Sequence, residues 1–390
     1  MLNSVQNPKA LGSMIFVRII YAVNWMNVGA IFYLMSPDLH AGVSGLGTMT
    51  AAFYIGIGIV QVPAGVLAAK WGPKRVVVIG IFLCSLSAIG TSLVSTVLEI
   101  SVLRFLVGAG MAFVFAPGIV IIAQLLRGGK SGMGVGLFNS AFDFGGLIAL
   151  FGWVIVATYT GWRLSLVLSG GIGVVTGILA AVFVPADEGS KEFTFSTNAL
   201  LKIVKDRQLI LLGFTMLGFD VGNTIISGFM ILYLVSINVL SGIIAGLVTS
   251  LVTVVPIFTA LWGGRVYDAT TRHRTTISLT IIGSAVALAF ASYPSIITAA
   301  ACSALGGVVA GIGYTYAFAG ARDRNDLGKE YDGLAIAWVN SIHLTGSFVP
   351  PVFFAGLVEL LGYSQAWLWS AALTLVFLIP ALLTLENWRR

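Results

Sequence analysis

The chain has 390 residues, of which 58% are hydrophobic and only 9% are charged, and its mean hydropathy is +0.99. Soluble domains carry about 25% charged residues, so this composition excludes a water-soluble protein. The formal net charge of +6 must therefore belong to a chain that lies in a membrane.

Twelve apolar stretches are each long enough to cross a bilayer. A run of about 20 apolar residues satisfies its own backbone hydrogen bonds as an α-helix, whereas barrel strands would have about 10 residues of alternating polarity. We therefore expect an all-α membrane protein with twelve transmembrane helices in two sets of six. The expected spans are Leu11–Met35, Gly45–Ala69, Val76–Val97, Ile100–Leu126, Met133–Thr158, Trp162–Val184, Ile210–Val235, Gly242–Gly264, Thr276–Ala291, Ile296–Ala321, Gly333–Leu357 and Ser364–Leu385.

The basic residues indicate the orientation, because Lys and Arg concentrate in cytoplasmic loops. With a cytoplasmic amino terminus, all of the 21 Lys and Arg residues except Arg18, Arg104 and Arg163 fall in cytoplasmic segments. This predicts a multi-pass protein of the cell membrane with both termini in the cytoplasm. Topology thus accounts for the net charge, and nucleic-acid binding is not expected.

One long polar segment, Pro185–Arg207, separates the two sets of six spans. Its charged side chains cannot enter hydrocarbon cheaply. We expect an N-terminal six-helix bundle at 1–184, a cytoplasmic central loop at 185–207 and a C-terminal bundle at 208–390. A plain linker is expected in the loop, although 196–205 has the pattern of a short surface helix.

Nothing in the sequence indicates a cofactor. Cys84 and Cys302 lie in apolar spans of different halves, which implies neither a disulfide nor a metal site. No glycine-rich stretch is followed by the Lys and Ser or Thr of a phosphate loop. We therefore expect no metal, no cofactor and no enzymatic activity, and any work must be driven by a gradient.

A loop pattern recurs after the second span of each half. It reads GVLAAKWGPKR at 65–75, and GRVYD at 264–268 followed by RHR at 272–274. The first copy resembles the loop motif of the major facilitator superfamily, and the second resembles a degenerate copy. The resemblance covers the whole chain and implies two six-helix halves that rock about a central site.

The resemblance assigns the loop residues to gating, with glycines for the tight turn and charges that hold one arrangement of the halves. Ala69 stands where the family pattern has an acid, while the second copy keeps Asp268. The alternative is that these charges only enforce topology. The residues concerned are Gly65, Gly72, Lys74, Arg75, Asp268 and Arg272.

Two further stretches bear on the kind of transport. LRFLVGAG at 103–110 is similar to the superfamily's arginine-glycine motif, which is associated with proton-coupled members. Arg104 has two interpretations, a structural or gating role and snorkelling to the interface. NSAFDFGG at 139–146 lacks the glycine-proline pair of many exporters, which disfavours a drug antiporter.

Five ionisable side chains lie within the expected spans: Arg18, Arg104, Asp143, Asp220 and His343. Intramembrane charges are costly and usually functional. In the fold that the resemblance implies, spans 1, 4, 7 and 10 line a central cavity and spans 2, 5, 8 and 11 meet along the seam between the halves. All five residues fall on these eight spans.

Uncharged polar residues on the same spans complete the expected site. Asn24, Asn27, Asn223, Tyr314 and Asn340 are candidates for orienting a substrate, and the alternative is that they are interhelical glue. Arg18 and Arg104 could each meet a carboxylate, and Arg18 would bind the substrate. Asp143, Asp220 and His343 would carry a proton.

We therefore expect a monomeric secondary transporter that works by alternating access and imports a small polar solute, preferably an organic anion, together with protons. Its partners would be that substrate, protons and the lipid bilayer. The alternative is an exporter of amphipathic or drug-like compounds. From another class, a membrane sensor or assembly factor is disfavoured because the chain shows no appended soluble domain.

Overall fold

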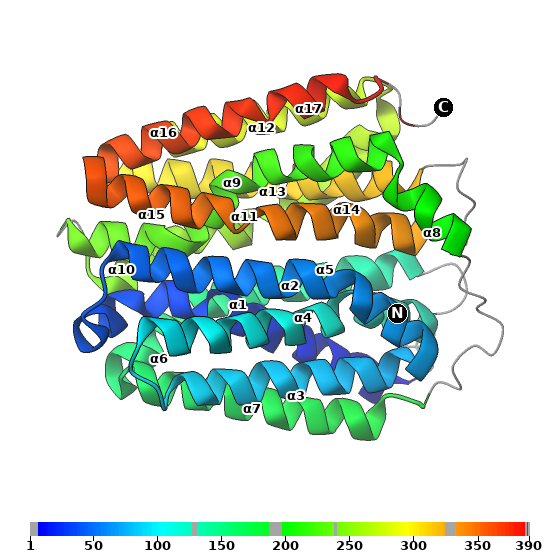
Figure 1. Ribbon diagram of the computed structural model, residues 1–390, viewed down its shortest axis with the longest axis horizontal. Helices are drawn as coiled ribbons and strands as arrows, with labels where there is room; N and C mark the ends of the chain where they lie inside the picture. The colour runs from blue at the N-terminus through cyan, green and yellow to red at the C-terminus, as the bar shows by residue number, and fades with distance from the viewer. Residues whose placement is uncertain are drawn as a thin grey trace.

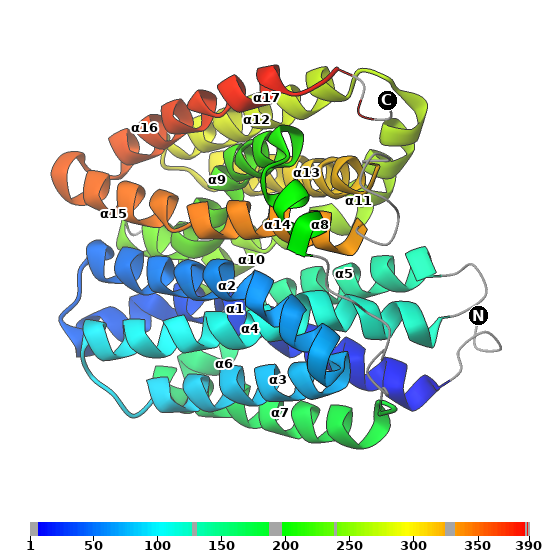
Figure 2. The same ribbon diagram turned by 45° about the vertical axis from the view of Figure 1, so that its right-hand side comes forward.

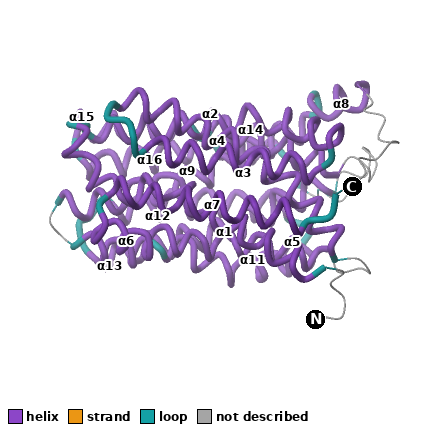
Figure 3. Tube along the Cα trace, turned by 90° about the horizontal axis from the view of Figure 1, so that it is seen from below, coloured by secondary structure: helices purple, strands orange, loops and turns teal. Residues whose placement is uncertain are grey.

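The computed structural model describes residues 7–126, 131–186, 197–237, 240–323, 332–386 and 388, and almost all of them are helical (Figure 3). In this part of the chain twelve helical spans are long and apolar enough to cross a bilayer, and no strand occurs. The expected all-α architecture is confirmed.

The first six spans form the N half and the last six the C half, which lie side by side along their length (Figures 1 and 2). The N half contains α1 (Pro8–Leu39), α2 (Val43–Trp71), α3 (Pro73–Thr91), α4 (Val97–Leu125), a fifth span made of α5 (Ser131–Leu147), η2 (Ile148–Gly152) and α6 (Trp153–Thr160), and α7 (Trp162–Phe183). The C half contains α9 (Arg207–Ser236), α10 (Gly242–Thr249) with α11 (Leu251–Ala269), α12 (His273–Ala291), α13 (Ile296–Arg322), α14 (Asp332–Gly346) with α15 (Val349–Leu361), and α16 (Tyr363–Val376) with α17 (Leu378–Leu383).

An even number of spans puts the start of α1 and the end of α17 on the same face, which we call the terminal face; the opposite one is the far face. A short helix, α8 (Thr197–Val204), lies at the terminal face (Figure 1). It falls within the segment 196–205, for which a short helix was the less favoured expectation. Residues 187–196 of the expected central loop lie outside the described residues.

The third span is shorter than expected. It ends at Thr91 and not at Val97, because Thr96 and Glu99 form a reciprocal capping box that begins α4 at Val97. Such a box satisfies backbone N–H groups that a new helix leaves unpaired. A local polar signal therefore overrides the apolar character of residues 93–97.

The eleventh span is interrupted at Ser347 and Phe348. Pro350 and Pro351 follow in the first turn of α15, and proline has no N–H to donate to the carbonyl four residues earlier. At the interruption, Ser347 donates both its backbone N–H and its hydroxyl to the His343 carbonyl, each at 2.9 Å. This interruption lies beside the ionisable cluster described below.

The two halves pack tightly toward the far face. A Cβ on Gly29 would lie 2.9 Å from the Gly228 carbonyl oxygen, and one on Gly47 would lie 2.7 Å from Ala355. Small residues permit such close approach between helices. A Cβ would meet no atom within 4 Å at Gly65, Gly136 and Gly333 toward the terminal face, nor at Gly228 and Gly356 toward the far face. The seam between the halves is therefore closely packed at Gly29 and Gly47, toward the far face.

Candidate functional site

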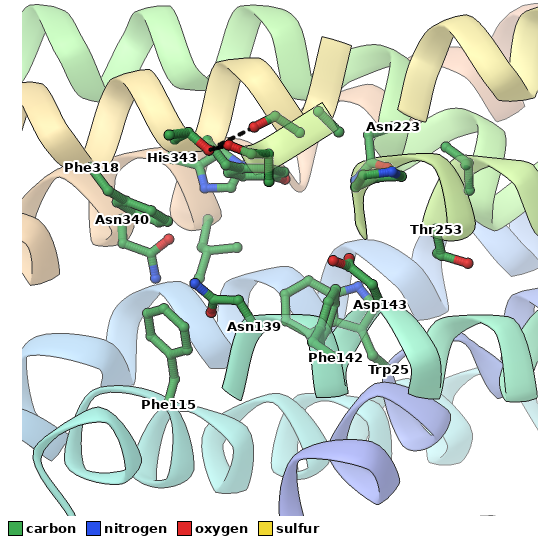
Figure 4. A pocket seen from close by; sticks show the side chains of 18 of the residues that line it. Trp25, Phe115, Asn139, Phe142, Asp143, Asn223, Thr253, Phe318, Asn340 and His343 are labelled. Carbon is green, nitrogen blue, oxygen red and sulfur yellow. Dashed lines mark hydrogen bonds between the residues drawn. The ribbon is translucent and has the colours of Figure 1, made fainter. Parts of the chain in front are cut away.

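A cavity of about 180 Å³ lies between the halves (Figure 4). Its lining residues come from α1, α2, α4 and α5 of the N half and from α9, α11, α13 and α14 of the C half. These are spans 1, 2, 4, 5, 7, 8, 10 and 11, as the resemblance implied. Spans 3, 6, 9 and 12 contribute none of the described lining residues.

Arg18 reaches this cavity from α1 and is surrounded by aromatic rings. Its side chain is 5% exposed, and its Cζ lies 4.4 to 5.0 Å from the ring centroids of Tyr21, Phe115, Phe138 and Phe142. The rings attract the cation through their π faces but accept no strong hydrogen bonds. Nε and Nη1 are buried without a hydrogen-bond partner among the described residues. Because such donors are costly to leave unpaired, the site suits an anionic ligand.

Asp143 brings a negative group to the same cavity from α5. Its charge interacts with that of Arg18, but Nε and Nη1 of Arg18 still have no hydrogen-bond partner in the described chain. In Figure 4 its carboxylate points from α5 into the space between the halves. Asp143 thus moderates the positive charge without occupying its donors.

Asp220 of α9 lies at the centre of a buried polar cluster in the C half. It is 2% exposed, and its Oδ2 lies 2.8 Å from His343 Nε2 of α14. Oδ2 also accepts from Thr224 at 2.9 Å, while Oδ1 accepts from Asn223 at 3.1 Å and from the Tyr314 hydroxyl. Each oxygen therefore has at least two partners, as a buried carboxylate requires.

Ser347 connects this cluster to the interruption of the eleventh span. Its hydroxyl lies 3.4 Å from Asp220 Oδ2 and donates to the His343 carbonyl. The other ring nitrogen of His343, Nδ1, is buried without a hydrogen-bond partner in the described residues. The Asp220 and His343 pair therefore lies directly beside the point where α14 meets α15.

Arg104 has a different environment from Arg18. It donates from Nη1 to the Asn24 carbonyl at 2.8 Å and from Nη2 to the Trp25 carbonyl at 3.0 Å. Its guanidinium lies 4.5 Å from the ring centroid of Phe53, and the residue does not line the cavity. Arg104 therefore ties α4 to α1 through charge-assisted hydrogen bonds.

Comparison with known proteins decides the family. The family model described as Major Facilitator Superfamily matches residues 14–320, which is most of the chain. The chain belongs to the Major Facilitator Superfamily. It is therefore a membrane transporter and not an enzyme.

Two relatives of this major facilitator differ in how much of the chain they match. An MFS-type transporter of Methanocaldococcus jannaschii is 23% identical over 92% of this chain and 94% of its own length. A protein of Cupriavidus necator named a probable sulfoacetate transporter is 24% identical, over 44% of this chain and 40% of its own.

A crystal structure of the nucleoside transporter NupG, 13% identical, superposes with a TM-score of 0.78, covering 96% of this chain and 98% of that one. At this identity the superposition establishes the fold alone.

The expected amide ligands separate into two groups in this major facilitator. Asn223 and Asn340 line the cavity, with Asn139 beside them (Figure 4). Asn24 and Asn27 do not line it: both are fully buried, and Asn27 donates to Asn24 at 3.2 Å and to Ser169 of α7 at 3.3 Å. The Asn27 side chain thus fastens α1 to α7, as the interhelical alternative describes, while the Asn24 side chain bonds to Asn27 and to the Ile20 carbonyl of the same helix.

The loop motif lies at the terminal face, far from the cavity. Gly72 alone separates α2 from α3 and has φ +85°, a conformation that favours glycine. Lys74 is half-buried, while Arg75, Asp268 and Arg272 are exposed. Gating by these residues, including Gly65, stays a prediction.

Several residues of the site were missed from the sequence. Phe138 and Phe142 flank Arg18 and are four residues apart, and Ser347 follows His343 by four. Residues four apart share a helix face. That spacing was therefore a usable signal for side chains next to each ionisable residue.

Proposed function

We propose that this transporter imports a small organic anion together with protons by alternating access. The proposal rests on the buried guanidinium of Arg18. It lines a cavity between the halves, and its Nε and Nη1 have no hydrogen-bond partner among the described residues. A carboxylate or sulfonate would satisfy both donors. Asn139, Asn223 and Asn340 would bind its remaining polar groups.

Relatives named for organic anions support this substrate class. Beside the Cupriavidus protein, a protein of Escherichia coli named a probable galactarate/D-glucarate transporter is 29% identical over 37% of this chain and 34% of its own. The chain spans less than half the length of both relatives. The substrates for which these two relatives are named carry acidic groups that would suit Arg18.

Asp220 and His343 are the proposed proton carriers, with Tyr314 as their hydrogen-bonding neighbour and Asp143 as the alternative carrier. A proton on Asp220 would change the partners of Ser347 and thereby the angle between α14 and α15. Since α15 packs against α2 toward the far face, that change would reach the seam between the halves. The two halves, 1–184 and 208–390, would rock about the cavity.

The terminal face would be cytoplasmic, because the loops on that side carry nearly all Lys and Arg residues. The close contacts of Gly29 and Gly47 toward the far face would then correspond to an inward-facing state of a monomer in the cell membrane.

Binding and uptake with Arg18→Gln test the proposal. Purified protein is titrated with monocarboxylates, dicarboxylates, sulfonates and their neutral amides, and uptake is measured in proteoliposomes with an inward proton gradient. Hydrogen bonds to charged groups contribute about 1.5–3 kcal/mol, so the variant should bind the preferred anion roughly 10- to 150-fold more weakly.

Arg163→Gln is the matched control, because Arg163 is 43% exposed and pairs with Asp38 at the far face. It should bind the anion like the wild type. Unchanged anion affinity in Arg18→Gln would refute the assignment of Arg18.

A second candidate function is export of amphipathic compounds. Trp25, Phe115, Phe142 and Phe318 line the cavity, and the multidrug resistance protein MdtG of Klebsiella pneumoniae is 26% identical over 50% of this chain. Tight binding of chemically diverse cations in the same titrations, without anion binding, would favour this candidate.

A further inference from the structure

Tyr54 of α2 brings a hydroxyl of the N half to the Asp220 cluster of the C half. The residue is 4% exposed and lines the cavity, and its hydroxyl lies 3.2 Å from Thr224 Oγ1. Thr224 in turn donates its single hydroxyl hydrogen to Asp220 Oδ2 at 2.9 Å. The hydrogen between Tyr54 and Thr224 must therefore come from Tyr54. The two hydrogen bonds therefore form a relay across the seam, in which Tyr54 donates to Thr224 and Thr224 donates to Asp220.

The ring of the same tyrosine faces the aromatic residues around Arg18. It packs edge-on against Trp25, with centroids 5.7 Å apart at 81°. Trp25 also contacts Tyr21 at 5.8 Å and Phe142 at 5.6 Å, two of the rings that surround the guanidinium. One side chain thus connects the proposed anion site to the acid that is proposed to carry the proton.

The donor and acceptor roles in these two hydrogen bonds depend on whether Asp220 carries a proton. As a carboxylate, Asp220 only accepts hydrogen bonds. If a proton binds at Oδ2 and is donated to the Thr224 oxygen, Thr224 turns its hydroxyl toward the Tyr54 oxygen. The hydrogen bond between the halves then reverses.

Other titratable groups face the same carboxylate. They are His343 from α14 and the Tyr314 hydroxyl from α13, and the charge of Arg104 from α4 acts on Tyr54 itself. His343 and Tyr314 belong to the C half, as Asp220 does. Tyr54 differs from these two because its hydrogen bond crosses between the halves.

We propose that Tyr54 is a positioning residue that couples anion occupancy at Arg18 to proton binding at Asp220. An anion that binds Arg18 displaces the surrounding rings, and Trp25 passes this displacement to Tyr54. The Tyr54 hydroxyl then changes its alignment with Thr224 and so alters the hydrogen bonding of Asp220. This inference rests on the proposed function, and it assigns the coupling step to a residue that contacts neither the guanidinium nor the carboxylate directly.

The test is Tyr54→Phe, which removes the hydroxyl and keeps the ring. Tyr33→Phe is a closely matched control, because the Tyr33 hydroxyl also lies 3.2 Å from a threonine oxygen, Thr158, but within the N half. The Kd of the preferred anion is measured by calorimetry over a range of pH, and proton uptake per anion is measured in proteoliposomes with an internal pH dye.

One linked proton changes Kd about tenfold per pH unit. We expect the wild type and Tyr33→Phe to show this slope, and Tyr54→Phe to bind the anion with a flat pH profile and fewer protons per anion. Thr224→Val removes the same hydrogen bond from the side of the C half and should also give a Kd that does not change with pH. The test therefore remains usable if Tyr54→Phe does not fold.

A wild-type slope and proton count in Tyr54→Phe would overturn the inference and leave the proposed function standing. Equal flattening by Tyr33→Phe would also overturn it, because the effect would not depend on the hydrogen bond between Tyr54 and Thr224. Anion binding without any pH slope in the wild type would instead refute proton coupling, and thus the proposed function itself.

Discussion

Gly29 of α1 and Gly228 of α9 bring the two halves into backbone contact, since a Cβ on Gly29 would lie 2.9 Å from the Gly228 carbonyl oxygen. The atom in the way belongs to the backbone, so it cannot rotate aside as the end of a flexible side chain could. This contact is therefore sensitive to a single methyl group.

Gly29→Ala should shift the protein away from the state that is packed toward the far face. Overpacking costs about 1–3 kcal/mol, which changes a two-state equilibrium roughly 5- to 150-fold. Spin labels at Leu93 and Tyr293, exposed far-face residues of the N and C halves, should report longer distances. Gly12→Ala in the same helix should leave the distances unchanged, since a Cβ there meets nothing within 4 Å. Equal distances in both variants would contradict the role of this contact.

Asp220→Asn should abolish anion accumulation driven by a pH gradient while retaining anion exchange. The amide keeps a hydrogen-bonding side chain of similar shape at the cluster but cannot take up and release a proton. Uptake and counterflow in proteoliposomes separate the two activities. Asp38→Asn, at an exposed ion pair on the far face, serves as the acid-to-amide control and should accumulate normally. If Asp220→Asn also accumulates normally, the proton carrier must be sought elsewhere, first at Asp143.

Arg104→Leu should lower thermal stability but leave anion affinity within about threefold of the wild type. Each lost hydrogen bond from the guanidinium to a carbonyl of α1 contributes about 1.5–3 kcal/mol, but Arg104 does not line the cavity. Melting curves and calorimetry on the same sample test both parts. A loss of anion affinity as large as that of Arg18→Gln would place Arg104 in the binding site after all.

The twelve spans were predictable because the bilayer imposes its requirement on each segment separately. A run that fills the hydrocarbon core with apolar residues must be helical wherever it stands in the fold. The one clear overrun, at the third span, came from an apolar stretch in which Thr96 and Glu99 already start the next helix. That capping signal was present in the sequence and was outweighed there by hydropathy.

The sequence identified the charged residues within the spans but did not show which of them line the cavity. Arg18 and Arg104 are both arginines within apolar spans, yet one lines the cavity among aromatic rings and the other bonds two carbonyls of α1. Asn27 looked equivalent to Asn223, but it faces Ser169 of α7. A helix turns about 100° per residue, so a small error in its assumed rotation moves a side chain from the cavity to the contact with a neighbouring helix.

Composition and order along the chain by themselves determined the membrane location, the helical class, the division into two sets of six spans and the small set of costly side chains within them. Only the tertiary structure decided which of those side chains share a cavity, that Asp220 pairs with His343, and that Tyr54 joins the halves through Thr224. Hydropathy depends on each segment alone, whereas these pairings depend on how segments far apart in the chain are rotated against one another.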